Sequence, residues 1–229
     1  MKSFSWVPNT ITALNLCAGI LSIFFSMHGV PCTAAWLIIA AAVCDFLDGM
    51  SARLLHAYSE LGKQLDSLAD VVSFGVAPAA ILDALPVNIS FGIMTLLPLL
   101  IPVAGAFRLA KFNIDSRQTS SFLGLPIPAN ALFFASLPLF LEYGSCQAIK
   151  DIIVSQLFCA TAILLFSWLM VSEVPMFSLK FKSLAWRDNR FQFIFLAIAA
   201  VLTAILQIGA LPFIIIAYIL LSLLKQYSA

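Results

Sequence analysis

Four aspartates, an arginine and several small residues occupy one stretch of otherwise apolar sequence. The pattern is Asp45-x2-Asp48-Gly49-x2-Ala52-Arg53-x8-Gly62-x3-Asp66-x3-Asp70. An ionised carboxylate near the centre of a bilayer costs roughly 2.5–3.5 kcal/mol on insertion scales. Four carboxylates close together would also repel one another unless a cation lay between them. The pattern therefore indicates a site for divalent metal ions and a phosphorylated substrate.

In helices, this spacing divides the aspartates into two pairs. Asp45 and Asp48 are three residues apart, and Asp66 and Asp70 are four apart, so each pair lies on one face of its helix. Two facing helices that each present two carboxylates can form a binuclear site of oxygen ligands, which suits Mg²⁺ or Mn²⁺. We expect two such divalent ions at these four aspartates.

The small residues between the aspartates have two interpretations. Gly49 and Ala52 lack bulk and would leave room for a substrate beside the helix backbone, while Arg53 offers a bidentate partner for phosphate oxygens. Small residues at four-residue spacing are, however, usually helix-packing contacts in membranes, and this alternative stays open for Gly49, Ala52 and Gly62. A single aspartate could be a proton relay, but four with an arginine favour metal and phosphate chemistry.

The composition identifies the elements that must position these residues. The chain has 229 residues, of which 62% are hydrophobic and 10% charged, and its mean hydropathy is +1.04. Soluble domains typically contain about 25% charged residues. The sequence therefore predicts an all-α, polytopic membrane protein in the lipid bilayer. No run of lysines and arginines predicts nucleic-acid binding.

A count of about 20 residues per span predicts eight transmembrane helices in a bundle. They cover residues 8–27, 33–55, 64–84, 89–111, 127–143, 150–171, 191–208 and 211–226. Residues 1–184 would form a core of six helices, and residues 185–229 a C-terminal hairpin that turns at Gly209-Ala210. The alternative is that the last two spans merge into one long helix.

Lysines and arginines are distributed unequally between the two ends of these spans. With the N-terminus inside, the cytoplasmic side receives Lys2, Arg53, Lys63, Arg108, Lys111, Arg117, Lys180, Lys182, Arg187, Arg190 and Lys225. The opposite side receives only Lys150. Since cytoplasmic loops are enriched in these residues, we expect a multi-pass protein of the cell (cytoplasmic) membrane with both termini in the cytoplasm. The aspartates then lie near the cytoplasmic face.

The aspartate pattern matches, at every fixed position, the signature D-x2-D-G-x2-A-R-x8-G-x3-D-x3-D, and the chain resembles the CDP-alcohol phosphotransferase family. Further segments are Pro8-Asn9-x-Ile11-Thr12-x2-Asn15-Leu16, Ser73-Phe74-Gly75-Val76-Ala77-Pro78-Ala79, Phe107-Arg108-Leu109-Ala110-Lys111-Phe112-Asn113, Phe122-Leu123-Gly124-Leu125-Pro126-Ile127-Pro128-Ala129 and Leu169-Met170-Val171-Ser172. Through these segments the chain resembles, within that family, the integral-membrane phosphatidylserine synthases of bacteria and archaea, over about residues 6–184.

The resemblance implies transfer of a phosphatidyl group from CDP-diacylglycerol to the hydroxyl of L-serine, with release of CMP. It implies that Asp45, Asp48, Asp66 and Asp70 hold two metal ions and that Asp70 is also the general base. The expected contacts to CDP-diacylglycerol are Gly49, Ala52, Arg53 and Gly62, with Asn9 and Thr12 as further candidates. It also implies a homodimer.

The serine pocket should contain a cation and polar groups, since serine has a carboxylate and an ammonium. Arg108, Lys111 and Asn113 lie at the cytoplasmic end of the fourth predicted span, and Ser73 follows Asp70 by about one turn. We expect these four residues to bind serine. For Arg108, the alternatives are a lipid phosphate and simple anchoring at the membrane surface.

Two other functions fit parts of this pattern. The same fold could use glycerol phosphate or an inositol phosphate as acceptor, but these would require more cationic residues around the site. A cation or proton transporter could use the aspartates as a relay, but such sites usually lie at the bilayer midplane between inverted repeats. The sequence has no internal repeat, so the transporter is the more distant alternative.

Overall fold

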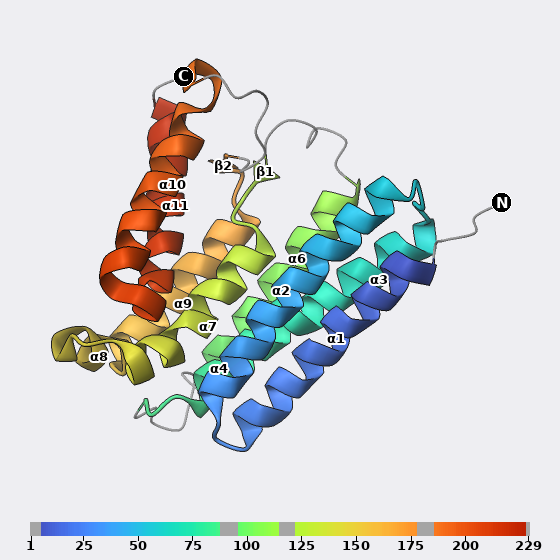
Figure 1. Ribbon diagram of the computed structural model, residues 1–229. Helices are drawn as coiled ribbons and strands as arrows, with labels where there is room; N and C mark the ends of the chain where they lie inside the picture. The colour runs from blue at the N-terminus through green and yellow to red at the C-terminus, as the bar shows by residue number, and fades with distance from the viewer. Residues whose placement is uncertain (1–5, 88–95, 115–121, 178–185, 228–229) are drawn as a thin grey trace.

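The protein is almost entirely helical in a computed structural model that describes residues 6–87, 96–114, 122–177 and 186–227 (Figure 1). The α-helices are α1 (Trp6–Met27), α2 (Pro31–Leu54), α3 (Glu60–Asp70), α4 (Ala77–Ala84), α6 (Leu100–Ile114), α7 (Ile127–Tyr143), α8 (Gln147–Ile153), α9 (Gln156–Val171), α10 (Trp186–Leu206) and α11 (Leu211–Tyr227). Shorter turns are the π-helix η1 (Val71–Val76) and the 3₁₀-helices η2 (Leu97–Leu99) and η3 (Gln207–Ala210). The predicted all-α fold is confirmed.

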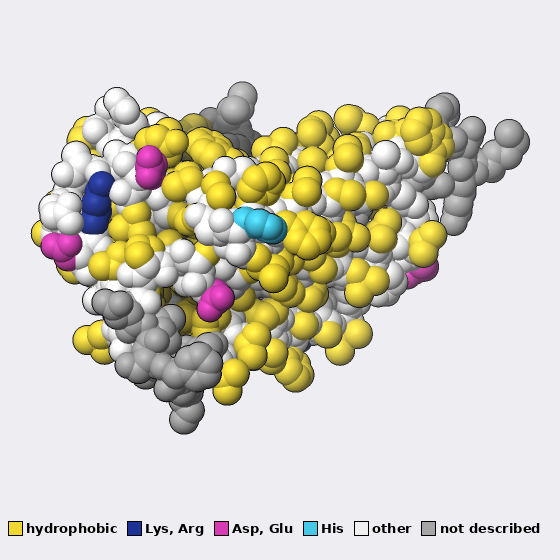
Figure 2. All heavy atoms as spheres, turned by 90° about the horizontal axis from the view of Figure 1, so that it is seen from below, with side chains coloured by type: hydrophobic (Ala, Val, Ile, Leu, Met, Phe, Trp, Pro, Cys, Tyr) yellow, Lys and Arg dark blue, Asp and Glu magenta, His cyan; other side chains and the backbone are white. Residues whose placement is uncertain are grey.

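The helices are suited to a membrane in length and in surface. Among the described residues, five helical stretches are long and apolar enough to cross a bilayer, or six if the bent pair α8 and α9 is one span. Helix α7 is apolar but has only 17 residues. Hydrophobic side chains cover much of the face seen in Figure 2, where charged groups are sparse. The chain is thus a multi-pass membrane protein, while the number of eight spans stays a prediction.

The helix predicted over residues 150–171 is wrong at its N-terminal end. The chain bends by 67° between α8 and α9. Ser155 lies at the bend, and its Oγ accepts a hydrogen bond from the backbone N–H of Phe158 at 3.3 Å. A serine in this position caps a new helix, because it satisfies a donor that has no partner in the first turn.

Helices α10 and α11 form a hairpin through η3. The rings of Phe195 and Tyr218 lie 5.9 Å apart, and Lys225 Nζ lies 5.8 Å from the ring of Phe191. In one continuous helix, residues 191 and 225 would be about 50 Å apart. These contacts exclude the alternative of a single long helix. The predicted boundary at residue 184 lies outside the described residues, as does the start of the span predicted at 89.

Helix α1 turns a polar and small face toward the helices that carry the aspartates. It packs against α2, α3, η1 and α4, and Figure 1 shows it running beside α2 and α3. Its buried residues recur every three or four positions: Pro8, Thr12, Asn15, Gly19, Ser22 and Ser26. Leu14, Leu21 and Phe24, on its other side, are exposed, as expected for a surface in contact with lipid. The polar face of α1 can therefore donate hydrogen bonds to the aspartates.

A short two-stranded sheet joins the start of α7 to the end of α9. Strand β1 (Phe122–Leu123) pairs antiparallel with β2 (Pro175–Met176). Gly124 follows β1 with a φ of +75°, and a Cβ there would lie 2.6 Å from the Met170 carbonyl oxygen. Glycine is required by both the positive φ and this close approach. The turn holds the end of α9 next to α7, although the sequence predicted no strand here.

Candidate metal and substrate site

Three of the four predicted metal ligands converge in the structure. Asp45 and Asp48 on α2 and Asp66 on α3 each offer one carboxylate oxygen, and these oxygens all lie within 4.8 Å of one another. Asp48 is buried, and Asp66 Oδ1 is buried without a hydrogen-bond partner. Carboxylates at this distance repel each other unless a cation is shared between them. The donor set and the unpaired oxygen fit a hard divalent ion.

Asp70 lies outside this close group and faces α1. It is buried, and Asn15 Nδ2 donates a hydrogen bond to Asp70 Oδ1 at 3.3 Å. The π-helical turn η1 begins at the next residue, Val71. Such turns are rare and frequently occur at functional sites. The structure thus gives Asp70 different surroundings from those of the other three aspartates.

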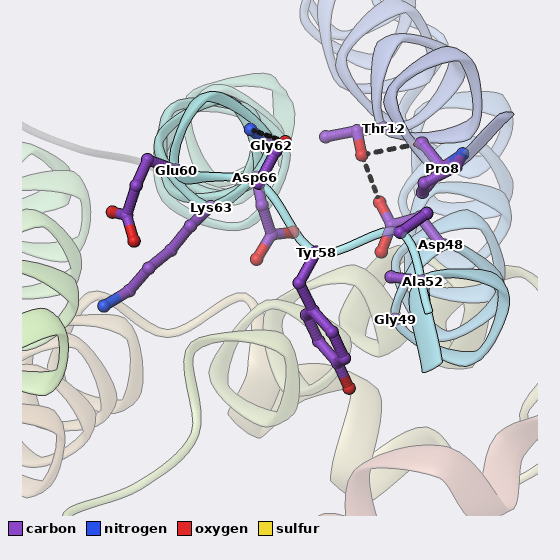
Figure 3. Close-up of a pocket in the computed structure, with 12 residues that line it drawn as sticks. Pro8, Thr12, Asp48, Gly49, Ala52, Tyr58, Glu60, Gly62, Lys63 and Asp66 are labelled. Atoms are coloured by element: carbon purple, nitrogen blue, oxygen red, sulfur yellow. Dashed lines mark hydrogen bonds between the residues drawn. The ribbon is translucent and has the colours of Figure 1, made fainter. Parts of the chain in front are cut away.

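Thr12 contacts one of the predicted metal ligands. Its hydroxyl lies 2.6 Å from Asp48 Oδ2 and 3.0 Å from the Pro8 carbonyl oxygen (Figure 3). The contact to Asp48 is the shorter, and it orients that carboxylate. Hydrogen bonds of this kind to metal-binding side chains typically fix their direction. Thr12 therefore positions Asp48 in addition to lining the cavity beside it.

A cavity of about 450 Å³ opens beside the carboxylates, between the end of α2 and the start of α3. Figure 3 shows Asp48 and Asp66 projecting into the same space. Its lining residues are Pro8, Thr12, Asp48, Gly49, Ala52, Ala57, Tyr58, Ser59, Glu60, Gly62, Lys63 and Asp66. Four residues predicted to contact the nucleotide are among them. Arg53, which is exposed, and Asn9 are not.

The two glycines of the cavity differ in their surroundings. Apart from its chain neighbours and the nearby backbone of its own helix, no heavy atom lies within 4 Å of a Cβ added at Gly49. A Cβ added at Gly62 would lie 2.9 Å from Asn9 Oδ1 and 3.0 Å from Ser59 Oγ. Gly49 therefore leaves open space in the cavity, whereas Gly62 allows α1 and α3 to approach each other. The packing interpretation fits Gly62 and does not fit Gly49.

Of the four residues predicted to bind serine, Arg108 has the surroundings expected of a ligand-binding side chain. It is only 8% exposed, and its Nε has no hydrogen-bond partner. Its charge interacts electrostatically with Asp70 and with Tyr218 on α11. A residue that merely anchors the protein at the membrane surface would leave its guanidinium in contact with water or headgroups. The burial of Arg108 argues against that alternative.

The other residues predicted for serine have partners within the protein. Lys111 forms an exposed ion pair with Glu173 at 2.8 Å. Asn113 Nδ2 donates to Ser67 Oγ at 2.9 Å. Ser73 is fully buried, and its hydroxyl donates to the Asn15 carbonyl oxygen at 3.0 Å. These three side chains are therefore engaged in holding helices together.

Sequence reasoning assigned no role to Asn15 or Tyr58. Asn15 follows Thr12 by three residues on the buried face of α1, so its place in the polar stripe of that helix was a usable signal. Tyr58 lines the cavity from the connection between α2 and α3. An aromatic residue near a membrane surface is common as an anchor, so the sequence alone gave no reason to select it.

Comparison with known proteins identifies relatives over most of the chain. The family model described as CDP-alcohol phosphatidyltransferase matches residues 5–171. A CDP-diacylglycerol–serine O-phosphatidyltransferase of Mycobacterium leprae is 34% identical over 226 residues, which are 95% of this chain and 72% of the relative. A protein of the same name from Helicobacter pylori is 43% identical over 128 residues, 55% of this chain and 54% of the relative. An archaetidylserine synthase of Methanothermobacter thermautotrophicus is 37% identical over 153 residues, 65% of this chain and 64% of the relative.

Proposed function

Because this chain belongs to the CDP-alcohol phosphatidyltransferase family, we propose that it transfers the phosphatidyl group of CDP-diacylglycerol to the hydroxyl of L-serine, giving phosphatidylserine and CMP. The observation that carries the proposal is the group of three carboxylates beside a cavity of about 450 Å³. The names of the relatives support serine as the acceptor.

We propose that the site holds two divalent ions, Mg²⁺ or Mn²⁺. Asp45, Asp48 and Asp66 would hold them, and Asp70 would complete the second site. The support is the convergence of three carboxylate oxygens within 4.8 Å and the unpaired Oδ1 of Asp66. When bound, such ions supply positive charge that stabilises the phosphate oxygens and the departing CMP.

The residues around the carboxylates bind and orient the two substrates. The diphosphate of the donor lies in the cavity against the open wall at Gly49. The serine oxygen forms a bond to the phosphorus of the phosphatidyl group, and the bond from that phosphorus to the CMP oxygen breaks. Asp70, oriented by Asn15, takes the proton of the serine hydroxyl. Such positioned proton transfer typically contributes about 10²- to 10⁴-fold to the rate.

Arg108 binds the carboxylate of serine in this proposal. The buried guanidinium of Arg108 has no ion pair or hydrogen bond among the described residues, and its electrostatic interaction with Asp70 is not a direct pair, so an anion bound to it would stabilise it. Among the described residues, Arg108 is the buried cationic side chain. An acceptor that carried an additional phosphate would need further cations near Asp70. Serine, with one carboxylate, matches one arginine.

We further propose eight membrane spans, both termini in the cytoplasm, and a homodimer in the cytoplasmic membrane. The start of α1, the connection between α2 and α3 and the end of α11 lie toward the same end of the bundle in Figure 1. Lys63 and Lys225 lie at that end. Lys2, Arg117, Lys180 and Lys182 lie outside the described residues. This arrangement would open the cavity to the cytoplasm, where CMP is released.

The test is the reaction itself with purified protein in detergent or in a bilayer. CDP-diacylglycerol, radiolabelled serine and Mg²⁺ or Mn²⁺ should give labelled lipid and CMP in equal amounts. Addition of a chelator should stop both. Release of CMP with glycerol phosphate or an inositol phosphate, but not with serine, would show that the acceptor is wrong.

A further inference from the structure

The side-chain oxygen of Asn15 accepts no hydrogen bond from the described residues. The residue is completely buried, and its Nδ2 donates to Asp70. Its Oδ1 has no hydrogen-bond partner. Buried polar atoms in folded proteins are almost always paired, so this oxygen calls for a donor from outside the chain. That donor must reach a point next to Asp70.

A second unpaired group lies near the same carboxylate. The Nε of Arg108 is buried without a partner, and the charge of Arg108 interacts with Asp70. The surroundings of Asp70 thus contain an unpaired acceptor on α1 and an unpaired cationic donor on α6. The ligand that satisfies both carries a donor group and an anionic group on one small molecule. An α-amino acid has this combination.

We propose that Asn15 binds the ammonium group of the acceptor amino acid through its side-chain oxygen, beside Asp70. Arg108 takes the carboxylate of the same molecule. The inference rests on the proposed function, since it assumes that serine is the acceptor. It gives α1 a direct part in recognising the acceptor, in addition to orienting the carboxylates.

The backbone around Asn15 holds this side chain in place. The Ser73 hydroxyl donates to the carbonyl oxygen of Asn15. One turn further along α1, a Cβ added at Gly19 would collide with Ser73, so α1 and η1 are in close contact. Ser73 is therefore a positioning residue for Asn15, and its hydroxyl is already used. A fixed amide oxygen can discriminate between acceptors better than a mobile one.

Acceptor analogues separate this role from a structural one. 3-Hydroxypropanoate is serine without the ammonium group, and ethanolamine is serine without the carboxylate. In Asn15→Ala we expect kcat/KM for serine to fall about 10- to 100-fold more than kcat/KM for 3-hydroxypropanoate, as for the loss of a hydrogen bond to a charged group. The preference for serine over ethanolamine should remain, because Arg108 is unchanged.

Two further variants control for folding. Ser22→Ala removes another buried polar group on the same face of α1, a hydroxyl that donates to the Ala34 carbonyl oxygen at 2.8 Å. In Ser22→Ala the ratio of kcat/KM for serine to kcat/KM for 3-hydroxypropanoate should equal that of the wild type. Asn15→Asp keeps an oxygen at the proposed contact, so it should also keep that ratio, even where the rate falls. Binding of CDP to each variant shows that the protein is folded.

Two results would overturn the inference. Equal loss for serine and 3-hydroxypropanoate in Asn15→Ala would show that Asn15 only orients Asp70 or holds a water molecule. Loss of the ratio in Asn15→Asp as well as in Asn15→Ala would show that the oxygen is not the contact. In both cases serine transfer by the wild-type protein would leave the proposed function standing. A wild-type protein that transfers to another alcohol but not to serine would instead refute the proposed function.

Discussion

Replacing Gly49 by alanine should leave the fold intact and weaken the use of CDP-diacylglycerol. Beyond its chain neighbours and the nearby backbone of α2, the new methyl group meets no heavy atom within 4 Å. Alanine is preferred to glycine inside a helix by about 0.5–1 kcal/mol, so the free energy of unfolding should stay the same or rise by up to that amount. A donor phosphate against this wall of the cavity would be displaced, at a cost of about 1–3 kcal/mol. The corresponding fall in kcat/KM is about 5- to 150-fold.

Gly62→Ala is the matched comparison, because it adds the same methyl group to the other glycine of the cavity. Here the Cβ would lie 2.9 Å from Asn9 Oδ1 and 3.0 Å from Ser59 Oγ. Ser59 Oγ also accepts a hydrogen bond from the Gly62 N–H at the start of α3, at 3.0 Å. The substitution must move one of these groups. We expect it to lower the free energy of unfolding by about 1–3 kcal/mol.

The assay for both variants combines thermal unfolding in one detergent with the initial rate of CMP release at saturating serine. Gly49→Ala should separate the two measurements, with stability retained and kcat/KM for CDP-diacylglycerol reduced. Gly62→Ala should lower both. A folded Gly49→Ala protein with wild-type kcat/KM would refute the reasoning, since the donor would then not lie against Gly49.

Three other substitutions test single contacts of the site. Thr12→Val removes the 2.6 Å hydrogen bond to Asp48, so the Mg²⁺ concentration for half-maximal activity should rise about tenfold or more; Thr12→Ser should restore it. Asp70→Asn cannot take a proton, so turnover should fall at least about 100-fold, while CDP binding measured by calorimetry should weaken far less, because Asp45, Asp48 and Asp66 remain. Lys111→Ala breaks an exposed ion pair with Glu173 that is worth at most about 1 kcal/mol. The KM for serine should therefore not change, and a tenfold rise would assign Lys111 to the serine pocket.

Local spacing was sufficient to predict the part of the site that lies on two consecutive helices. Asp45, Asp48 and Asp66 converge because helical geometry fixes which face each occupies, and the short connection between α2 and α3 brings the helices together. Hydropathy likewise predicted the helical hairpin at the C-terminus. It could not detect the 67° bend before α9, because only two polar residues, Ser155 and Gln156, separate the apolar run at 152–154 from Leu157.

The surroundings of individual side chains depend on tertiary packing, so residue spacing could not predict them. Gly49 and Gly62 have the same residue type and similar places beside the aspartates, but Asn9 on α1 and the capping Ser59 crowd only Gly62. Lys111 and Arg108 lie one turn apart on α6, yet one forms an exposed ion pair and the other is buried near Asp70. No property of the single helix distinguishes these residues, because the difference comes from α9, α11 and α1.

The polar face of α1 explains how this helix bundle can keep several carboxylates close together. A buried carboxylate needs either hydrogen-bond donors or a cation. Helix α1 supplies donors to two of them, through Thr12 to Asp48 and through Asn15 to Asp70. It supplies none to Asp66 Oδ1, which is buried without a hydrogen-bond partner. If α1 donated hydrogen bonds to every carboxylate, the carboxylates would bind a cation more weakly. An unpaired oxygen on Asp66 would leave negative charge for a metal ion, while the hydrogen bond from Thr12 holds Asp48 at the wall of the cavity.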